Sequence, residues 1–435
     1  MSFRNKGLVL AMEELEEVLP AEPVEMVPET QAQVETAAGE LEEHVDGVEE
    51  VVEATGDAEA DATALTDVHD IMEESVEKGE GLDETSAEIA EVAVESICAR
   101  LGIRTQRKAM PAMESFGNKS SRLTATKIAM ESVMDKVKQV WTAILNAIKM
   151  VWEKIKGFFA GLLKHRGLLL KHLESLQKRV ETLTAEHKAG DAKLTGGIAK
   201  AFSIDGKADY ATATAIVETA GKLMGVIGAC SGVAARQAAS MLKASVEGDA
   251  SEVSLVETFY KDVAKSVATL GSAGEGKDGA KHFGNLVGGR TIAVLEKTEG
   301  DKFLFNLSLV DGGKDAAKEI EVLDKTKMLE LIKKAIVLVK DLQQAEKIEK
   351  ELANVSKACN ETTQSILKGA SKLTEDKDEA ANMNKAAVTI RQLNSTVAKF
   401  GSSLPGAVFQ AAKSAGDYVS ASAGAHKVPK AAETK

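Results

Sequence analysis

The sequence of 435 residues has few cysteines, prolines and aromatic residues, and each shortage excludes a class of protein. Its three cysteines, Cys98, Cys230 and Cys359, are far apart and odd in number, so we expect neither a disulfide framework nor a thiolate metal site. A reducing compartment fits this usage. Aromatic residues make up 4% of the chain and prolines number 6, a composition that favours helices over an all-β sandwich or barrel. No apolar run reaches the roughly 18 residues that span a bilayer, so an integral membrane protein is not expected.

The first quarter of the chain also lacks basic residues. No Lys or Arg occurs between Lys6 and Lys78. Residues 1–114 hold 7 basic and 30 acidic residues, a net charge of −23, whereas residues 115–435 hold 47 and 37, a net charge of +10. Low hydrophobicity and high charge predict that this acidic segment, residues 1–114, is largely disordered. On charge alone, a tail that only keeps the chain solvated explains the segment equally well.

A short pattern, Ala-X-Glu, recurs where the charge changes sign. Two copies read Ala-Met-Glu-Ser, and the first of them follows a basic cluster and Pro111. An extended, accessible boundary of this kind is where a protease binds its substrate, because cleavage requires a locally unfolded segment. The two boundary copies are Ala112-Met113-Glu114-Ser115 and Ala129-Met130-Glu131-Ser132, and further copies end at Glu95 and Glu13.

An acidic amino-terminal region that ends at Ala-X-Glu and precedes a Lys-rich helical body resembles the inner-head proteins of phiKZ-like jumbo bacteriophages. The resemblance implies that a prohead protease cuts this chain after the glutamate during capsid maturation. In this scheme the glutamate supplies the P1 side chain, the alanine fits a small upstream subsite of the protease, and the serine becomes the new amino terminus. The residues in these roles are Glu114 and Glu131, Ala112 and Ala129, and Ser115 or Ser132, with Glu95 and Glu13 as secondary sites.

The same resemblance implies where the product resides and what it meets. The mature protein is expected inside the phage head with packaged DNA and other head proteins, after a precursor stage in the host cytoplasm. Ejection with the genome would add a host membrane or a host protein as a partner. Loss of residues 1–114 would change the net charge from −13 to +10, so the remainder would offset DNA phosphates without reading bases. Nothing resembles a sequence-specific DNA-binding motif.

Apolar residues recur at helical spacing from Val133 to Leu163, opposite a face rich in lysine. Both tryptophans, Trp141 and Trp152, fall in this stretch, together with Phe158 and Phe159. We favour a core helix that packs on the rest of the protein. The alternative is a basic amphipathic helix that binds an anionic membrane or a partner's groove, which would make the protein a membrane-surface effector masked by its acidic segment. In a further alternative the acidic segment is a scaffold-like assembly tag.

The remaining patterns predict a mainly α, α+β fold. Residues 167–188 either continue the preceding helix or fold back as a hairpin. The β-prone runs within 291–309 predict a β-hairpin and residues 319–322 a third short strand, so that a small hairpin or meander covers about 290–322. Further helices are expected at 324–356, 358–372 and 377–399. The expected divisions are an acidic propeptide at 1–114, a cleavage linker at 115–132, a helical α+β body at 133–400 and a flexible tail at 401–435.

No catalytic constellation stands out. Residues 271–278 match Gly-x4-Gly-Lys, but Asp278 stands where a nucleotide-binding P-loop needs Ser or Thr, so a linker is the better interpretation. His165 and His172 are about two helical turns apart, which is too far for one metal ion. The cysteines are more typical of small core residues than of nucleophiles. We therefore expect a structural protein with no enzymatic activity, cofactor or metal ion.

Overall fold

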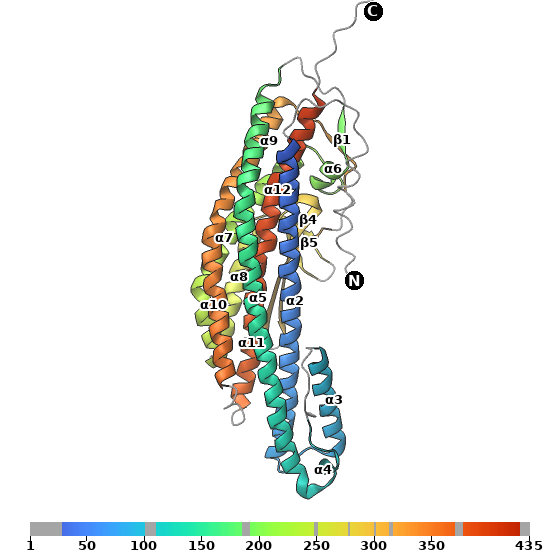
Figure 1. Ribbon diagram of the computed structural model, residues 1–435, viewed down its shortest axis with the longest axis vertical. Coiled ribbons are helices and arrows are strands. Elements are labelled where there is room, and N and C mark those ends of the chain that lie inside the picture. Colours follow the sequence, from blue (N-terminus) through green and yellow to red (C-terminus); the bar gives the residue numbers. More distant parts are fainter. Residues whose placement is uncertain are drawn as a thin grey trace, which may run out of the picture.

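Two long antiparallel helices, α2 (Pro28–Glu77) and α5 (Lys119–Glu181), form the spine of the protein in the computed structural model (Figure 1). Their direction follows from contacts at the two ends: Glu40 meets His165, whereas Leu82 donates its backbone N–H to Thr126. At 1.5 Å per residue, α5 is about 95 Å long. The structure describes residues 28–100, 110–184, 192–247, 251–276, 279–299, 302–312, 316–369 and 377–426.

The helix α5 runs without a break through two expected boundaries. It begins where the Asn118 side chain accepts a hydrogen bond from the backbone N–H of Ser120, at 3.2 Å. Apolar residues at three- and four-residue steps then stay buried as far as Val180. Most of the expected linker at 115–132 is therefore the first part of this helix, because its apolar residues continue the same buried stripe. Residues 167–181 continue the helix and do not fold back.

Residues 28–77 and 84–100 of the acidic segment are helical and packed, which corrects the expectation of disorder for them. The apolar residues of α2 are sparse, but they face the core and pack mainly against α5. A seven-residue step is the spacing by which long helices pair, and it is the step of Val34, Leu41 and Val48 and of Leu65 and Met72. Residues 1–27, also expected to be disordered, lie outside the described residues.

The other long helices pack beside one part of the spine, and the lower end of the spine in Figure 1 projects beyond them.

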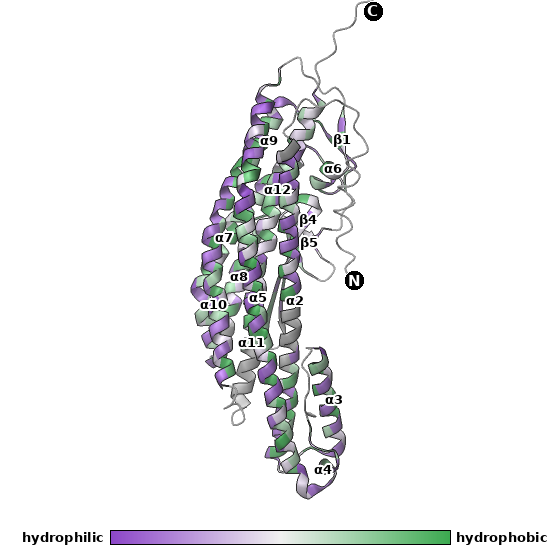
Figure 2. Cartoon of the chain, viewed as in Figure 1, coloured by the Kyte–Doolittle hydropathy of each residue, from purple (hydrophilic) through white to green (hydrophobic). Residues whose placement is uncertain are grey.

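The helix expected at 324–356 is divided by a 3-10 turn at Leu342–Gln344. Figure 2 shows hydrophilic and hydrophobic residues alternating along these helices, as amphipathic packing requires. The helices are α7 (Tyr210–Glu247), α8 (Ser251–Ala268), α9 (Lys325–Asp341), α10 (Ala345–Gly369), α11 (Lys377–Ala398) and α12 (Leu404–Ala425), with a short α6 (Gly197–Ala201) before them.

The helix α7 is long and apolar enough, by length and composition, to cross a membrane. The sequence was expected to contain no membrane-spanning stretch, because it has no continuous apolar run of that length. The helix α7 nevertheless reaches a high mean hydropathy, because Ala and Gly fill many of the positions between its larger apolar residues. Of its most apolar 18-residue window, 56% is buried inside the protein. It packs on α10, α11 and α12, which is also the environment of a core helix.

The strands form two small antiparallel sheets. The hairpin expected within 291–309 is confirmed, with Ile292 opposite Leu309 in the register. The third strand expected at 319–322 instead pairs with a strand near residue 194, and Ile320 is buried there between exposed glutamates. One sheet is β2 (Ser272–Glu275), β3 (Lys281–Phe283), β4 (Arg290–Glu299) and β5 (Lys302–Asp311), and the other is β1 (Lys193–Thr195) and β6 (Glu319–Glu321). The Gly-x4-Gly-Lys match thus supplies β2 where a linker was expected.

The region expected to be a flexible tail, 401–435, is helical over much of its length. A π-helical turn at Lys399–Ser403 leads directly into α12, whose alanines are buried among the other helices. Small side chains allow this close helix packing, and their Ser, Ala and Gly composition was mistaken for that of a flexible segment. Residues 427–435 lie outside the described residues.

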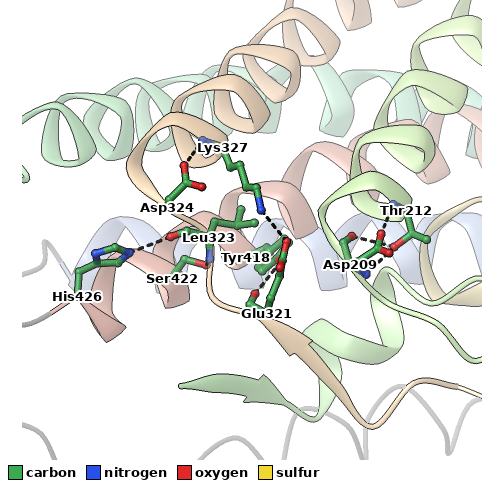
Figure 3. A network of polar contacts seen from close by, with 9 residues as sticks. All are labelled: Asp209, Thr212, Glu321, Leu323, Asp324, Lys327, Tyr418, Ser422 and His426. Atoms are coloured by element: carbon green, nitrogen blue, oxygen red, sulfur yellow. Dashed lines mark hydrogen bonds and ion pairs between the residues drawn. The ribbon is translucent and has the colours of Figure 1, made fainter. Parts of the chain in front are cut away.

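Polar contacts fasten the end of α12 to the strand β6 and the residues after it (Figure 3). The Tyr418 hydroxyl donates to the carbonyl oxygen of Glu321 at 2.7 Å, and the backbone N–H of Leu323 donates to the Ser422 hydroxyl oxygen at 3.2 Å. The carbonyl oxygen of Leu323 lies 2.8 Å from Nε2 of His426. These contacts hold the carboxyl-terminal end of α12 on β6 and on the residues that follow it.

Candidate processing site and the helices that cover it

The Glu114 motif lies in the connection between α3 (Glu84–Arg100) and α5, at the projecting end of the spine (Figure 1). Ala112 and Glu114 are exposed, while Met113 and Ser115 are half-buried. Glu114 begins the four-residue helix α4, which ends at Gly117. Of the chain that the structure describes between Arg100 and Lys119, this is the only helical turn.

Two buried residues hold this connection on either side of the motif. Met110 is 3% exposed before it and Phe116 is fully buried after it. Between them, the backbone N–H groups of Ser115 and Phe116 donate to the carbonyl oxygens of Ala112 and Met113, both at 2.9 Å. Opening this turn breaks two hydrogen bonds with a net contribution of about 1 kcal/mol each, and it must also displace the buried Phe116. It does not require the unwinding of α3 or α5, the packed helices on either side.

The residues on the carboxyl side of Glu114 are attached to α5. The Ser121 hydroxyl donates to the carbonyl oxygen of Ser115 at 2.8 Å, and Nε of Arg122 donates to that of Phe116 at 2.9 Å. A new amino terminus at Ser115 would thus already be held on the basic remainder of the chain.

The other copies of the motif are less accessible. Glu131 and Ser132 lie inside α5, and Ala129, the upstream residue of that copy, is fully buried. Glu95 is exposed but lies inside α3. Cleavage at either position requires unwinding a packed helix, which also exposes its buried apolar residues. Glu13 lies outside the described residues.

The acidic helix α2 covers the spine helix with small and apolar residues. Gly161 of α5 faces Leu41 so closely that a Cβ at Gly161 would lie 3.4 Å from a Leu41 methyl carbon. Val45 of α2 and Phe158 of α5 both lie against Gly406 of α12. The acidic segment therefore closes part of the core of the basic remainder.

Carboxylates of α2 also contact a histidine and a lysine of the basic remainder. Oε2 of Glu40 lies 2.8 Å from Nε2 of the buried His165. Oε1 of Glu49 lies 2.5 Å from Nζ of Lys399 and accepts a hydrogen bond from the Ser403 hydroxyl at 2.9 Å. Lys399 is largely shielded from water, so its pair with Glu49 is stronger than a pair on an open surface.

Arg290, at the start of β4, lies in the same field of acidic residues. Burial lowers the pKa of its guanidinium, and the nearby carboxylates of Glu42, Asp311 and Glu49 oppose that change. Two of these three carboxylates belong to α2. The acidic helix therefore supplies negative charge beside this half-buried cation.

The aromatic residues of the predicted amphipathic helix face the core. Trp141 is 1% exposed, Phe158 and Phe159 are fully buried, and Trp152 is half-buried. In the folded chain these side chains pack among helices, which agrees with the favoured interpretation and leaves few of their atoms for a membrane.

The cysteines are core residues, as expected. All three are buried. Burial raises the pKa of the Cys230 thiol to about 11, and burial also raises the pKa of Cys98. Thiols that stay protonated at neutral pH are poor nucleophiles.

Two features of α2 were not predicted from the sequence. The first is the pairing of Glu40 and Glu49 with the basic remainder, for which the seven-residue step of the neighbouring apolar residues was the available signal. The second is a group formed by His69, Asp70 and Glu73 on α2. A histidine followed four residues later by a carboxylate places both on one helix face, and this spacing was the available signal.

Comparison with known proteins gives one family. A sequence model described as phiKZ-like phage internal head proteins matches residues 13–421, which includes both the acidic segment and the basic remainder. No curated protein and no solved structure matches the chain.

Proposed function

Because the chain belongs to the phiKZ-like phage internal head proteins, we propose that it is a precursor cut after Glu114, whose remainder then shares the head with packaged DNA. Membership of this family makes it a structural component of the virion, located inside the phage head. Processing, contact with DNA and later ejection into the host are the steps that we add.

The position of Glu114 carries the proposal. The residue is exposed in a short connection between two buried anchors, and the net charge of the chain changes sign there. The competing positions Glu95 and Glu131 lie inside packed helices. A prohead protease that accepts Ala-X-Glu would therefore cut first at Glu114, in the role of the P1 residue, with Ala112 upstream.

The cut alone would leave the acidic helices in place, because α2 is held by its packing against α5. It would convert an intramolecular contact into an intermolecular one and so remove the effective concentration that the chain connection supplies. Release of residues 1–114, rather than the cut, changes the net charge from −13 to +10. Release would also uncover His165 and Lys399, the partners of Glu40 and Glu49.

The amino terminus of the protein in purified virions tests the cut. Mass spectrometry is expected to find a start at Ser115. Phage that encode Glu114→Gln should retain the uncut chain, whereas the matched change Glu131→Gln should leave the start at Ser115 unchanged. A virion protein that begins at Met1, or one that begins at Ser132 without a Ser115 form, would contradict the proposal.

Salt-dependent DNA retention tests the second step. A chain that starts at Ser115 is expected to bind DNA of any sequence at low salt and to release it as the salt concentration rises, because lysines displace condensed counterions. The full-length chain should bind much more weakly under the same conditions. Equal binding by the two chains would contradict the proposed change of partner.

A membrane-binding function is the second candidate, and one contact favours it. Val45 of the acidic helix and Phe158 of α5 lie on the same residue, Gly406, so release of α2 would uncover part of the aromatic stripe. Flotation of the Ser115-start chain with anionic liposomes measures this candidate separately from DNA retention. Flotation without DNA retention would favour a role at the host membrane after ejection.

A further inference from the structure

A buried histidine and a buried glutamate lie together on α2, in the projecting part of the spine. His69 is 1% exposed and Glu73 is 8% exposed. They are four residues apart and therefore share one face of the helix. Neither forms an ion pair with a lysine or arginine that the structure describes, and Nε2 of His69 has no hydrogen-bond partner there. A buried imidazole nitrogen left without a hydrogen-bond partner is costly in free energy.

Asp70 completes the group. Its Oδ1 lies 3.7 Å from Nδ1 of His69, and its side chain is 43% exposed. One ligand atom from each of His69, Asp70 and Glu73 lies within 4.8 Å of the others. The group thus offers one imidazole nitrogen and two carboxylate oxygens from a single helix.

We infer that His69, Asp70 and Glu73 bind one divalent transition-metal ion of the zinc type. Zinc is bound at about 2.0 to 2.2 Å by imidazole nitrogen and carboxylate oxygen, so three ligands in a tetrahedral arrangement lie about 3.4 Å apart. The present separations, which reach up to 4.8 Å, are wider than that, so binding requires the two carboxylate side chains to turn toward the imidazole. One of the three donor atoms is an imidazole nitrogen. This favours zinc or cobalt over calcium and magnesium, which take oxygen ligands.

The bound ion would give the buried imidazole of His69 a partner and would place a positive charge beside Glu73. Three protein ligands leave one coordination position for water or for a ligand from another molecule. All three residues precede Glu114, so the ion belongs to the full-length chain and its binding does not depend on processing.

Metal binding to the full-length, untagged chain tests this inference. After treatment with a chelator and its removal by dialysis, titration with Zn²⁺ is expected to give one equivalent bound per chain. His69→Ala and Glu73→Gln should each weaken binding by about tenfold or more. His44→Ala removes an exposed histidine of the same helix and should leave binding unchanged. Circular dichroism of each variant shows whether it remains folded, and Glu73→Gln preserves the shape of the side chain.

Co²⁺ supplies a second measurement that does not depend on affinity alone. Its visible absorption changes when an imidazole nitrogen coordinates the ion, so the spectrum of the wild-type chain should be lost in His69→Ala and kept in His44→Ala. Excess Mg²⁺ should not displace it. The absence of a bound equivalent, wild-type affinity in both His69→Ala and Glu73→Gln, or a loss of binding in His44→Ala would overturn the inference.

Discussion

The helices α2 and α5 lie side by side along the spine, yet they are built in opposite ways. α5 has apolar residues at three- and four-residue steps and buries them from Ala125 to Val180. α2 contains no Lys or Arg, and its apolar stripe is sparse, with Val34, Ala38 and Leu41 buried and Val45 half-buried. α5 therefore has a strong apolar stripe of its own, whereas the sparse stripe of α2 depends on its partner.

The charge of α2 strengthens this dependence. Glu42, Asp46 and Glu50 stand four residues apart on one row of the helix, and each like-charged pair destabilises an isolated helix by about 0.2 to 0.5 kcal/mol. Isolated helices are marginal in water even without such repulsion. A signature of disorder in the sequence thus describes the acidic segment alone, and packing on α5 supplies the order that the structure shows.

Separating the acidic segment from the basic remainder tests whether α2 depends on α5. A peptide of residues 28–100 should lose most of the helical signal in far-ultraviolet circular dichroism, because α5 is absent. Adding the chain of residues 115–435 should restore helix beyond the sum of the two separate spectra. A peptide that is fully helical alone would show that α2 does not depend on α5.

The dependence of α2 on α5 also explains which parts of the fold could be predicted from the sequence. The hairpin within 291–309 and the core face of residues 133–163 follow from local periodicity, and both were predicted correctly. The order of α2 and α12 was missed, because it results from contacts between segments hundreds of residues apart, such as Glu49 with Lys399.

The candidate site shows the same division. Its motif and the preference for Glu114 follow from the sequence, where a basic cluster and Pro111 precede that copy, whereas the burial of Ala129 in the second copy required the structure. The positions of Met110 and Phe116 as anchors also required the structure, since nothing in their spacing indicates which connection they hold.

The turn after α2 provides a sharper and smaller test. Gly81 has φ +64°, and a Cβ there would lie 2.8 Å from the backbone carbon of Arg122 in α5. Gly79 has φ +72° and nothing within 4 Å of a Cβ. Gly79→Ala should lower the free energy of unfolding by about 1 to 2 kcal/mol through the left-handed conformation alone. Gly81→Ala should lower it further, because the backbone of α5 must also move.

Chemical denaturation of both variants measures the difference. The excess in Gly81→Ala reports how firmly the turn between α2 and α3 is seated on α5. An equal decrease in the free energy of unfolding of the two variants would mean that the backbone of α5 moves without an energetic penalty and that the turn is not tightly packed against it. Their shared left-handed conformation makes Gly79→Ala the matched control.

The smallest expected effect concerns His172, where α5 meets both α2 and α12. Burial lowers the pKa of its imidazole below the ordinary 6.5, an effect that Lys413 adds to and that the carboxylates of Asp417 and Glu35 oppose. In the unfolded chain the ordinary pKa returns, so below about pH 6.5 the unfolded state binds more protons than the folded state. Stability is therefore lost as the pH falls through that value, and it is fully present above it.

Thermal unfolding between pH 7.5 and 5.5 tests this sign, because His172→Gln removes the group that the folded chain keeps uncharged. The Tm of the wild-type chain should fall more steeply toward low pH than that of His172→Gln, so the two curves diverge as the solution is acidified. His44→Gln, at an exposed position of α2, should follow the wild-type curve. Parallel curves for wild type and His172→Gln would mean that the junction of α2, α5 and α12 admits water freely to this side chain.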